Sequence, residues 1–104
     1  MYLARFSYDI SPTDRQQAME LIRREVAAAR QKKLHARLLV PLTREYGGAA
    51  LQFEVELANL EQLEDFRQRG VGSDKETGRW MQEFSKILQS PPMVEILRLD
   101  DAGA

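Results

Sequence analysis

The sequence predicts a single α+β domain of the split βαβ, ferredoxin-like type, a four-stranded antiparallel sheet with its helices on one face. Three observations support this fold class. The spacing of apolar residues along the chain alternates between that of strands and that of helices, and it predicts the element order β-α-β-β-α-β. The second helical region contains a break. Right-handed crossovers then give the strand order 4-1-3-2, which places the second strand at an edge. Pro41 interrupts that same strand, and a proline without an N–H is tolerated chiefly at a sheet edge.

The first strand and the first helix are predicted over residues 2–10 and from about residue 12 to Lys33. Tyr2, Phe6 and Tyr8 recur at period two, which favours a half-buried strand. Ser11 is expected to cap the helix by accepting from a backbone amide, with Pro12 at the first helical position. The helix carries one apolar stripe, made of Ala18, Met19, Ile22, Val26 and Ala29.

A hairpin, two helices and a last strand complete the predicted domain. Residues 35–43 and 50–57 form the hairpin, with Tyr46-Gly47-Gly48 at its turn. Asn59 caps a short helix that ends at Gly70, and Ser73-Asp74-Lys75-Glu76 matches a capping box for a longer helix that reaches Leu88 before Pro91-Pro92. Residues 93–99 form the last strand. Residues 1–99 are therefore expected to be one domain, and residues 100–104 a flexible C-terminal tail.

The two faces of the predicted sheet differ in character. The face assigned to the helices is apolar and holds Tyr2, Phe6, Tyr8, Leu51, Phe53 and Val55. The other face mixes apolar and charged residues: Leu3, Arg5, Ser7, Asp9, His35, Arg37, Leu39, Gln52, Glu54, Glu56, Glu95, Leu97 and Leu99. An apolar patch on a small domain usually marks a partner surface, so we expect a homodimer or a larger oligomer.

Composition excludes several functional classes. The net charge is -1, and the second sheet face carries carboxylates, so nucleic acid is not an expected partner. The chain has no Cys and one His, which excludes disulfides, thiol catalysis and a multi-His metal site. No apolar run reaches the roughly 18 residues of a membrane span, and the N-terminus lacks a signal-peptide pattern. We therefore expect a cytoplasmic protein without a membrane partner, a metal or a cofactor.

The candidate site residues lie on the mixed sheet face. His35, Arg5 and Glu54 are the candidates for acid–base or orienting roles, because His titrates near neutral pH and Arg5 is expected between Glu54 and Glu95. The alternative, which the sequence favours for Arg5, is a cross-strand ion network that keeps charges from being buried unpaired. The full candidate set for ligand binding is Arg5, His35, Arg37, Gln52, Glu54 and Glu95.

The chain resembles the dimeric α+β-barrel superfamily, which includes antibiotic-biosynthesis monooxygenase-like, NIPSNAP-like and stress-responsive barrel proteins. The resemblance spans about residues 2–99. It rests on the element order, on the broken second helix with Leu63, Phe66, Trp80 and Phe84, and on the ending Ser90-Pro91-Pro92-Met93-Val94-Glu95-Ile96-Leu97. It implies a homodimer in which two sheets pack face to face, burying the mixed face.

The sequence leaves three functions open. The first is a small homodimeric barrel protein that binds a small molecule or supports assembly. The second is a cofactor-independent monooxygenase or isomerase with its site in the barrel cavity. The third is a structural or stress-related oligomer. A ligand-sized cavity with converging polar groups favours the second, and a sheet interface filled with side chains favours the third.

Overall fold

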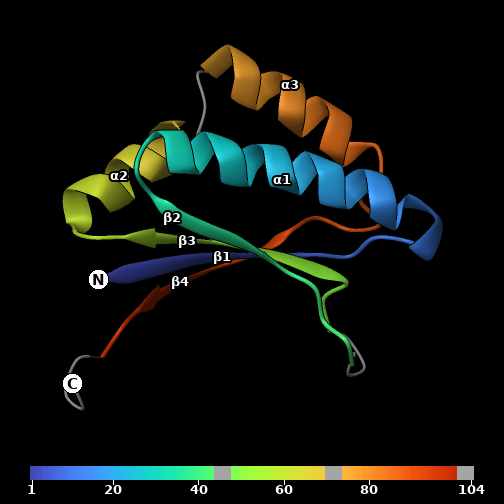
Figure 1. Ribbon diagram of the computed structural model, residues 1–104, viewed down its shortest axis with the longest axis horizontal. Helices are drawn as coiled ribbons and strands as arrows, with labels where there is room; N and C mark the ends of the chain where they lie inside the picture. Colours follow the sequence, from blue (N-terminus) through green and yellow to red (C-terminus); the bar gives the residue numbers. More distant parts are fainter. Residues whose placement is uncertain (44–47, 70–73, 101–104) are drawn as a thin grey trace.

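The computed structural model describes residues 1–43, 48–69 and 74–100 as one sheet with helices above it (Figure 1). In chain order the elements are β1 (Tyr2–Tyr8), the short 3-10 helix η1 (Pro12–Asp14), α1 (Arg15–Gln31), β2 (His35–Leu39), β3 (Leu51–Leu57), α2 (Leu60–Arg69), α3 (Asp74–Ser85) and β4 (Met93–Arg98).

The sheet has the predicted order. Its strands run β2-β3-β1-β4, which is 4-1-3-2 read from the other edge, and each neighbouring pair is antiparallel. Strand β2 lies at an edge, as predicted. It ends at Leu39, however, so Pro41 follows the strand and does not interrupt it. Figure 1 shows α1, α2 and α3 on the same side of the sheet, so the other side is open. The ferredoxin-like α+β fold is confirmed.

The start of α1 differs from the prediction, because the side chain of Ser11 caps no backbone amide. The Asp14 N–H donates to the Ser11 carbonyl (3.0 Å) in the 3-10 helix. The Ser11 hydroxyl donates to the Asp14 carboxylate (3.2 Å) instead. The end of α1 lies at Gln31, and Lys33 adopts a left-handed φ of 62° that closes the helix.

The start of α2 confirms the predicted cap. The Asn59 Oδ1 accepts from the Gln62 amide (2.9 Å), and the Gln62 Oε1 accepts from the Ala58 amide (2.8 Å). This reciprocal pair satisfies two amides that the helix itself leaves free. Helix α3 ends at Ser85, three residues earlier than predicted, and Leu88 forms a bridge with Ile10. The predicted turn at residues 46–47, the helix end at Gly70, the cap at Ser73 and the tail at 101–104 lie outside the described residues.

The core lies between the sheet and the helices. The apolar face of β1 and β3 packs against α1, whose buried residues are Ala18, Leu21, Ile22, Val26 and Ala29. Leu63 and Phe66 of α2 and Phe84 of α3 complete it. In the described ranges, no helix is both long and apolar enough to cross a membrane.

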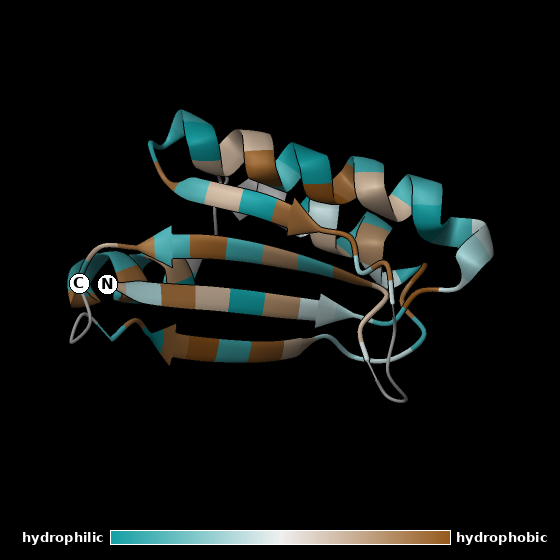
Figure 2. Cartoon of the chain, turned by 60° about the horizontal axis from the view of Figure 1, so that its bottom comes forward, coloured by the Kyte–Doolittle hydropathy of each residue, from teal (hydrophilic) through white to brown (hydrophobic). Residues whose placement is uncertain are grey.

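The open face is partly apolar, as predicted, with one difference. Leu3 is only 5% exposed within the single chain, so it adds little to an accessible patch. Leu39 and Leu97 are half-buried, and Leu99 is exposed. Figure 2, which turns the open side of the sheet forward, shows hydrophobic residues along the edge strand β4 with a hydrophilic residue between them.

Candidate functional site

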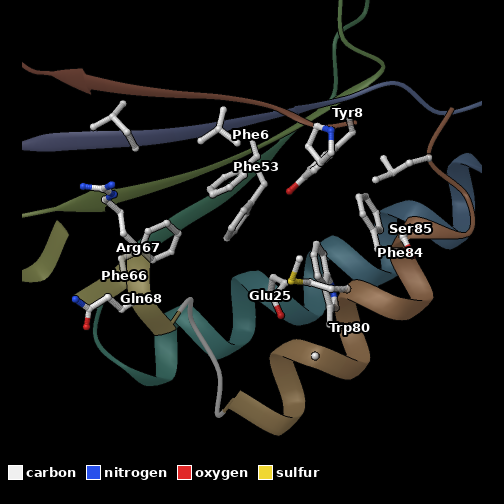
Figure 3. Close-up of a pocket in the computed structure, with 16 residues that line it drawn as sticks. Phe6, Tyr8, Glu25, Phe53, Phe66, Arg67, Gln68, Trp80, Phe84 and Ser85 are labelled. Carbon is white, nitrogen blue, oxygen red and sulfur yellow. The ribbon is translucent and has the colours of Figure 1, made fainter. Parts of the chain in front are cut away.

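A pocket of about 700 Å³ lies between the sheet and the helices. Its walls come from β1, β3 and β4 on one side and from α1, α2 and α3 on the other (Figure 3). Ligand pockets typically measure roughly 300–1,000 Å³, so this one is large enough for a small organic molecule. The residues that line it are Phe6, Tyr8, Glu25, Phe53, Phe66, Arg67, Gln68, Gly78, Trp80, Met81, Phe84, Ser85, Leu88, Pro92, Val94 and Ile96.

Aromatic rings form two groups around this pocket. Phe6 contacts Phe53 and Phe66, with ring centroids 5.8 Å and 5.9 Å apart. Phe84 contacts Tyr8 edge to face at 4.7 Å, and its other contact is Trp80, stacked at 4.7 Å with an interplanar angle of 14°. Such rings offer flat, rigid surfaces on which a planar ligand can stack.

The pocket exists because the helices leave β4 uncovered. Val94 and Ile96 belong to the helix-facing side of β4, since they pair with Phe6 and Ala4 of β1. They are nevertheless 54% and 43% exposed. Helix α1 packs chiefly over β2 and β3. In the strand order these two strands lie at the end of the sheet away from β4. An apolar surface therefore faces open space beneath α3.

Trp80 fixes the position of α3 over α1. Its indole N–H donates to the carbonyl of Leu21 (2.6 Å), and Arg24 lies 3.6 Å from the Glu83 carboxylate. Trp80 is only half-buried, because part of its ring borders the pocket. The sequence-based interpretation of Trp80 as a packing residue agrees with these contacts, although the same ring also lines the pocket.

Five polar side chains also line the pocket, namely Tyr8, Glu25, Arg67, Gln68 and Ser85. Tyr8 comes from β1 and Glu25 comes from α1 (Figure 3). Burial raises the pKa of the Tyr8 phenol above its ordinary value of 10.0, and the negative charge of Glu25 raises this pKa further. Tyr8 therefore remains protonated and keeps its hydroxyl as a hydrogen-bond donor. A carboxylate can only accept, so the pair offers both functions.

The predicted site residues lie on the opposite, open face of the sheet. Their register places Arg37, Glu54, Arg5 and Glu95 in one row across all four strands. The Arg5 Nε donates to Glu54 Oε2 (2.5 Å), and the Arg37 Nε donates to Glu54 Oε1 (2.8 Å). Arg37 also reaches Glu56 at 3.5 Å. The structure thus brings Arg5, Arg37 and Glu54 together as an ion cluster.

Glu54 is the centre of this cluster. Its side chain is 2% exposed, whereas those of Arg5 and Arg37 are 32% and 50% exposed. Burial alone would raise the pKa of the Glu54 carboxyl. The hydrogen bonds from Arg5 and Arg37, together with their positive charges, outweigh burial and lower that pKa below its ordinary value of 4.5. Glu54 is therefore ionised at neutral pH and is held by two cations.

The remaining predicted residues lie around the cluster. Gln52 donates to the Ser7 hydroxyl (3.2 Å). Glu95 is opposite Arg5 in the register, but no ion pair joins them in the described part of the chain. His35 begins β2 opposite Glu56 and is exposed. The prediction that this face binds a ligand through Arg5, His35, Arg37, Gln52, Glu54 and Glu95 remains a prediction.

The pocket itself was missed by sequence reasoning. Phe6, Tyr8 and Phe53 were assigned to the apolar face, and nothing in their spacing shows that the helices stand clear of it. One signal was available: Glu25 falls within the apolar stripe of α1. Among the described residues, no group of three or more His, Cys, Asp or Glu side chains is arranged to hold a metal ion.

Solved structures share this fold at low sequence identity. A NIPSNAP domain protein from Burkholderia xenovorans has a TM-score of 0.73 at 10% identity, covering 100% of this chain and 99% of that one. An antibiotic biosynthesis monooxygenase has 0.71 at 16%, covering 96% and 99%. The protein Rv0793 from Mycobacterium tuberculosis has 0.71 at 14%, covering 100% of both chains. No protein-family model matches the chain, and no curated protein matches its sequence.

Proposed function

We propose that this chain is a small-molecule-binding protein that takes a flat, largely apolar ligand in the pocket between the sheet and α3. The observation that carries the proposal is the pocket itself, because among the described residues six aromatic side chains border about 700 Å³ of space. Folded proteins rarely leave so much apolar surface beside an internal opening. A planar ligand would stack on the half-buried ring of Trp80 from one side and contact the half-buried ring of Phe6 from the other, because Phe84 and Phe53 are only 2% and 4% exposed.

A fluorescence titration with N-phenylnaphthylamine, a neutral probe that brightens in apolar surroundings, tests this proposal. Val94→Trp places a large ring inside the pocket, and Val94 is exposed enough to be enlarged without a clash. We expect this variant to weaken probe binding by about tenfold or more, since it fills the space that the probe needs.

Met93→Trp is the matched control. Met93 is the preceding residue, 66% exposed, and it pairs with Ser7 on the open face. This variant should bind the probe as the wild type does. Equal losses in the two variants, or no binding by the wild type, would contradict the proposed pocket. A wild type that binds no probe but forms a stable oligomer would favour the structural alternative.

The half-apolar open face supports a homodimer as part of the same proposal. Leu39, Leu97 and Leu99 lie on it and remain accessible to a partner. Sedimentation at micromolar concentration should give about twice the monomer mass, since the burial of such a patch favours association. Leu97→Lys should shift the protein toward the monomer. Leu42→Lys, at a residue that is 96% exposed beyond β2, should not.

A cofactor-independent monooxygenase is the second candidate function. It is supported by the fold shared with a protein named an antibiotic biosynthesis monooxygenase and by the Tyr8 hydroxyl and Glu25 carboxylate inside the pocket. The test is oxygen consumption with a dihydroxynaphthalene, which the pocket is large enough to hold. Consumption above the buffer rate that Val94→Trp abolishes and Met93→Trp retains would support an enzyme. Binding without consumption would leave a binding protein.

A further inference from the structure

Gly78 lies inside helix α3, where glycine is an unfavourable residue. The helix runs from Asp74 to Ser85, so Gly78 stands about one turn after its start. Glycine loses more conformational freedom on folding than any other residue, and only proline is less favourable in a helix. Because a glycine here weakens α3, its presence points to a reason outside the helix itself.

Neither the backbone nor the packing of α3 supplies that reason. Gly78 has a helical backbone, which every other residue except proline adopts readily. In the described part of the chain, a Cβ atom added at Gly78 would meet no heavy atom within 4 Å beyond its own stretch of α3. A larger side chain would therefore fit at this position without a clash.

The pocket supplies a reason. Gly78 lines it together with Met81 and Ser85. The steps between these residues are three and four, which is the spacing of one helix face. At 1.5 Å per residue, this face of α3 measures about 10 Å from Gly78 to Ser85. Met81 and Ser85 present side chains to the pocket, whereas at Gly78 the backbone of α3 is bare.

The pocket extends along α3 as far as α2. Figure 3 shows Phe66 and Gln68 of α2 at one end of the pocket and Ser85 at the other. Helix α3 begins on the side of α2 and runs away from it (Figure 1). Gly78, in the first half of α3, therefore borders the part of the pocket that is nearer to α2.

We propose that Gly78 determines the length of the ligand. The pocket takes a flat ring that carries an apolar arm, and the arm lies against the bare backbone of α3 at Gly78. This inference rests on the proposed function. Val94 and Ile96 of β4, which are 54% and 43% exposed, give the same pocket an apolar wall on the sheet side. A side chain at residue 78 would occupy space that the arm needs.

Fluorescence titration with two probes of different length tests this inference. Naphthylamine has the naphthalene ring alone, and N-phenylnaphthylamine adds a phenyl arm; both are uncharged at neutral pH. We expect the wild type to bind the longer probe about tenfold more tightly, because burial of the arm adds apolar contact. Gly78→Leu should weaken binding of the longer probe by about tenfold and leave the shorter probe unchanged.

Urea denaturation of the same variants gives a second, opposite effect. Gly78→Ala and Gly78→Leu should both raise the urea midpoint, since alanine and leucine are better helix formers and meet no described atom. Gln82→Leu is the control for binding. Gln82 is exposed on α3 and is not among the lining residues, so this variant should bind both probes as the wild type does.

The outcomes separate this inference from the proposed function. If the wild type binds the shorter probe as tightly as the longer one, or if Gly78→Leu changes both affinities equally or neither, Gly78 does not determine ligand length and the inference is overturned. A lower urea midpoint in Gly78→Ala, or the same selective loss in Gln82→Leu, would overturn it too. A wild type that binds neither probe would contradict the proposed function as well.

Discussion

Removing the two arginines beside Glu54 should destabilise the fold by more than the sum of the single effects. Glu54 is 2% exposed and accepts from both Arg5 and Arg37, so either cation alone still satisfies its charge. A hydrogen bond to a charged group contributes roughly 1.5–3 kcal/mol when buried. Because the two arginines are 32% and 50% exposed, solvent screening reduces this to about 1 kcal/mol for each single Arg→Met variant.

The double variant leaves a buried carboxylate without any cation. Leaving one partner of a buried pair uncompensated typically costs about 3–5 kcal/mol. The double variant Arg5→Met/Arg37→Met should therefore lose at least ~1 kcal/mol beyond the two single losses. Adding Glu54→Met should restore much of the stability, since it removes the charge that has lost its partners.

Urea denaturation at one fixed protein concentration measures these differences. In a thermal denaturation, a loss of 1 kcal/mol in the free energy of unfolding would lower the Tm of a domain of this size by roughly 4–8 °C. Arg23→Met, at an exposed arginine of α1, controls for the loss of one positive charge. If the double variant loses only the sum of the two single losses, within about 0.5 kcal/mol, the arginines act independently and the reasoning is refuted.

Two further predictions concern Glu54 and Trp80. The pKa of Glu54 is lowered in the folded state, so its contribution to stability is complete above its unfolded pKa near 4.5 and is lost as pH falls through the folded pKa. The free energy of unfolding should fall more steeply below pH 5 in the wild type than in Glu54→Gln, and equal slopes would contradict this. Trp80→Phe should cost about 1 kcal/mol, for the hydrogen bond to Leu21, and Trp80→Ala about 2–3 kcal/mol, because the ring is only half-buried. Urea midpoints compare the two variants, and equal losses would show that the stacking on Phe84 contributes nothing.

The strand order could be predicted from the sequence because two independent constraints agree. Right-handed connections place the second strand at an edge, and a proline predicted within that strand favours the same position. The structure confirms the position, although β2 ends at Leu39 and Pro41 lies beyond it. The side of each strand that faces the helices also followed from period-two alternation, since a one-residue slip would move every side chain to the other face. The pairing of Arg5 with Glu54 followed from that register.

Details of contact could not be predicted in the same way. The role of Arg37 as a second cation on Glu54 depends on how far its side chain reaches across the sheet. The separation of Arg5 from Glu95 shows that register alone does not create an ion pair. In the 3-10 helix the Asp14 amide donates to the Ser11 backbone carbonyl, so it does not bond to the Ser11 side chain. The Ser11 hydroxyl donates to the Asp14 carboxylate instead.

Alternation determines the side of the sheet that a residue faces, but it does not determine whether a helix covers that residue. Val55 and Val94 both follow the apolar pattern, yet Val55 is fully buried and Val94 is 54% exposed. The difference arises because α1 covers β3 while α3 stands away from β4. Coverage depends on the lengths and crossing directions of helices, which a hydrophobic pattern does not contain. A charged residue inside an apolar stripe is then informative, because a fully covered position would penalise it strongly. Glu25 is such a residue, and it lines the space that the helices leave open.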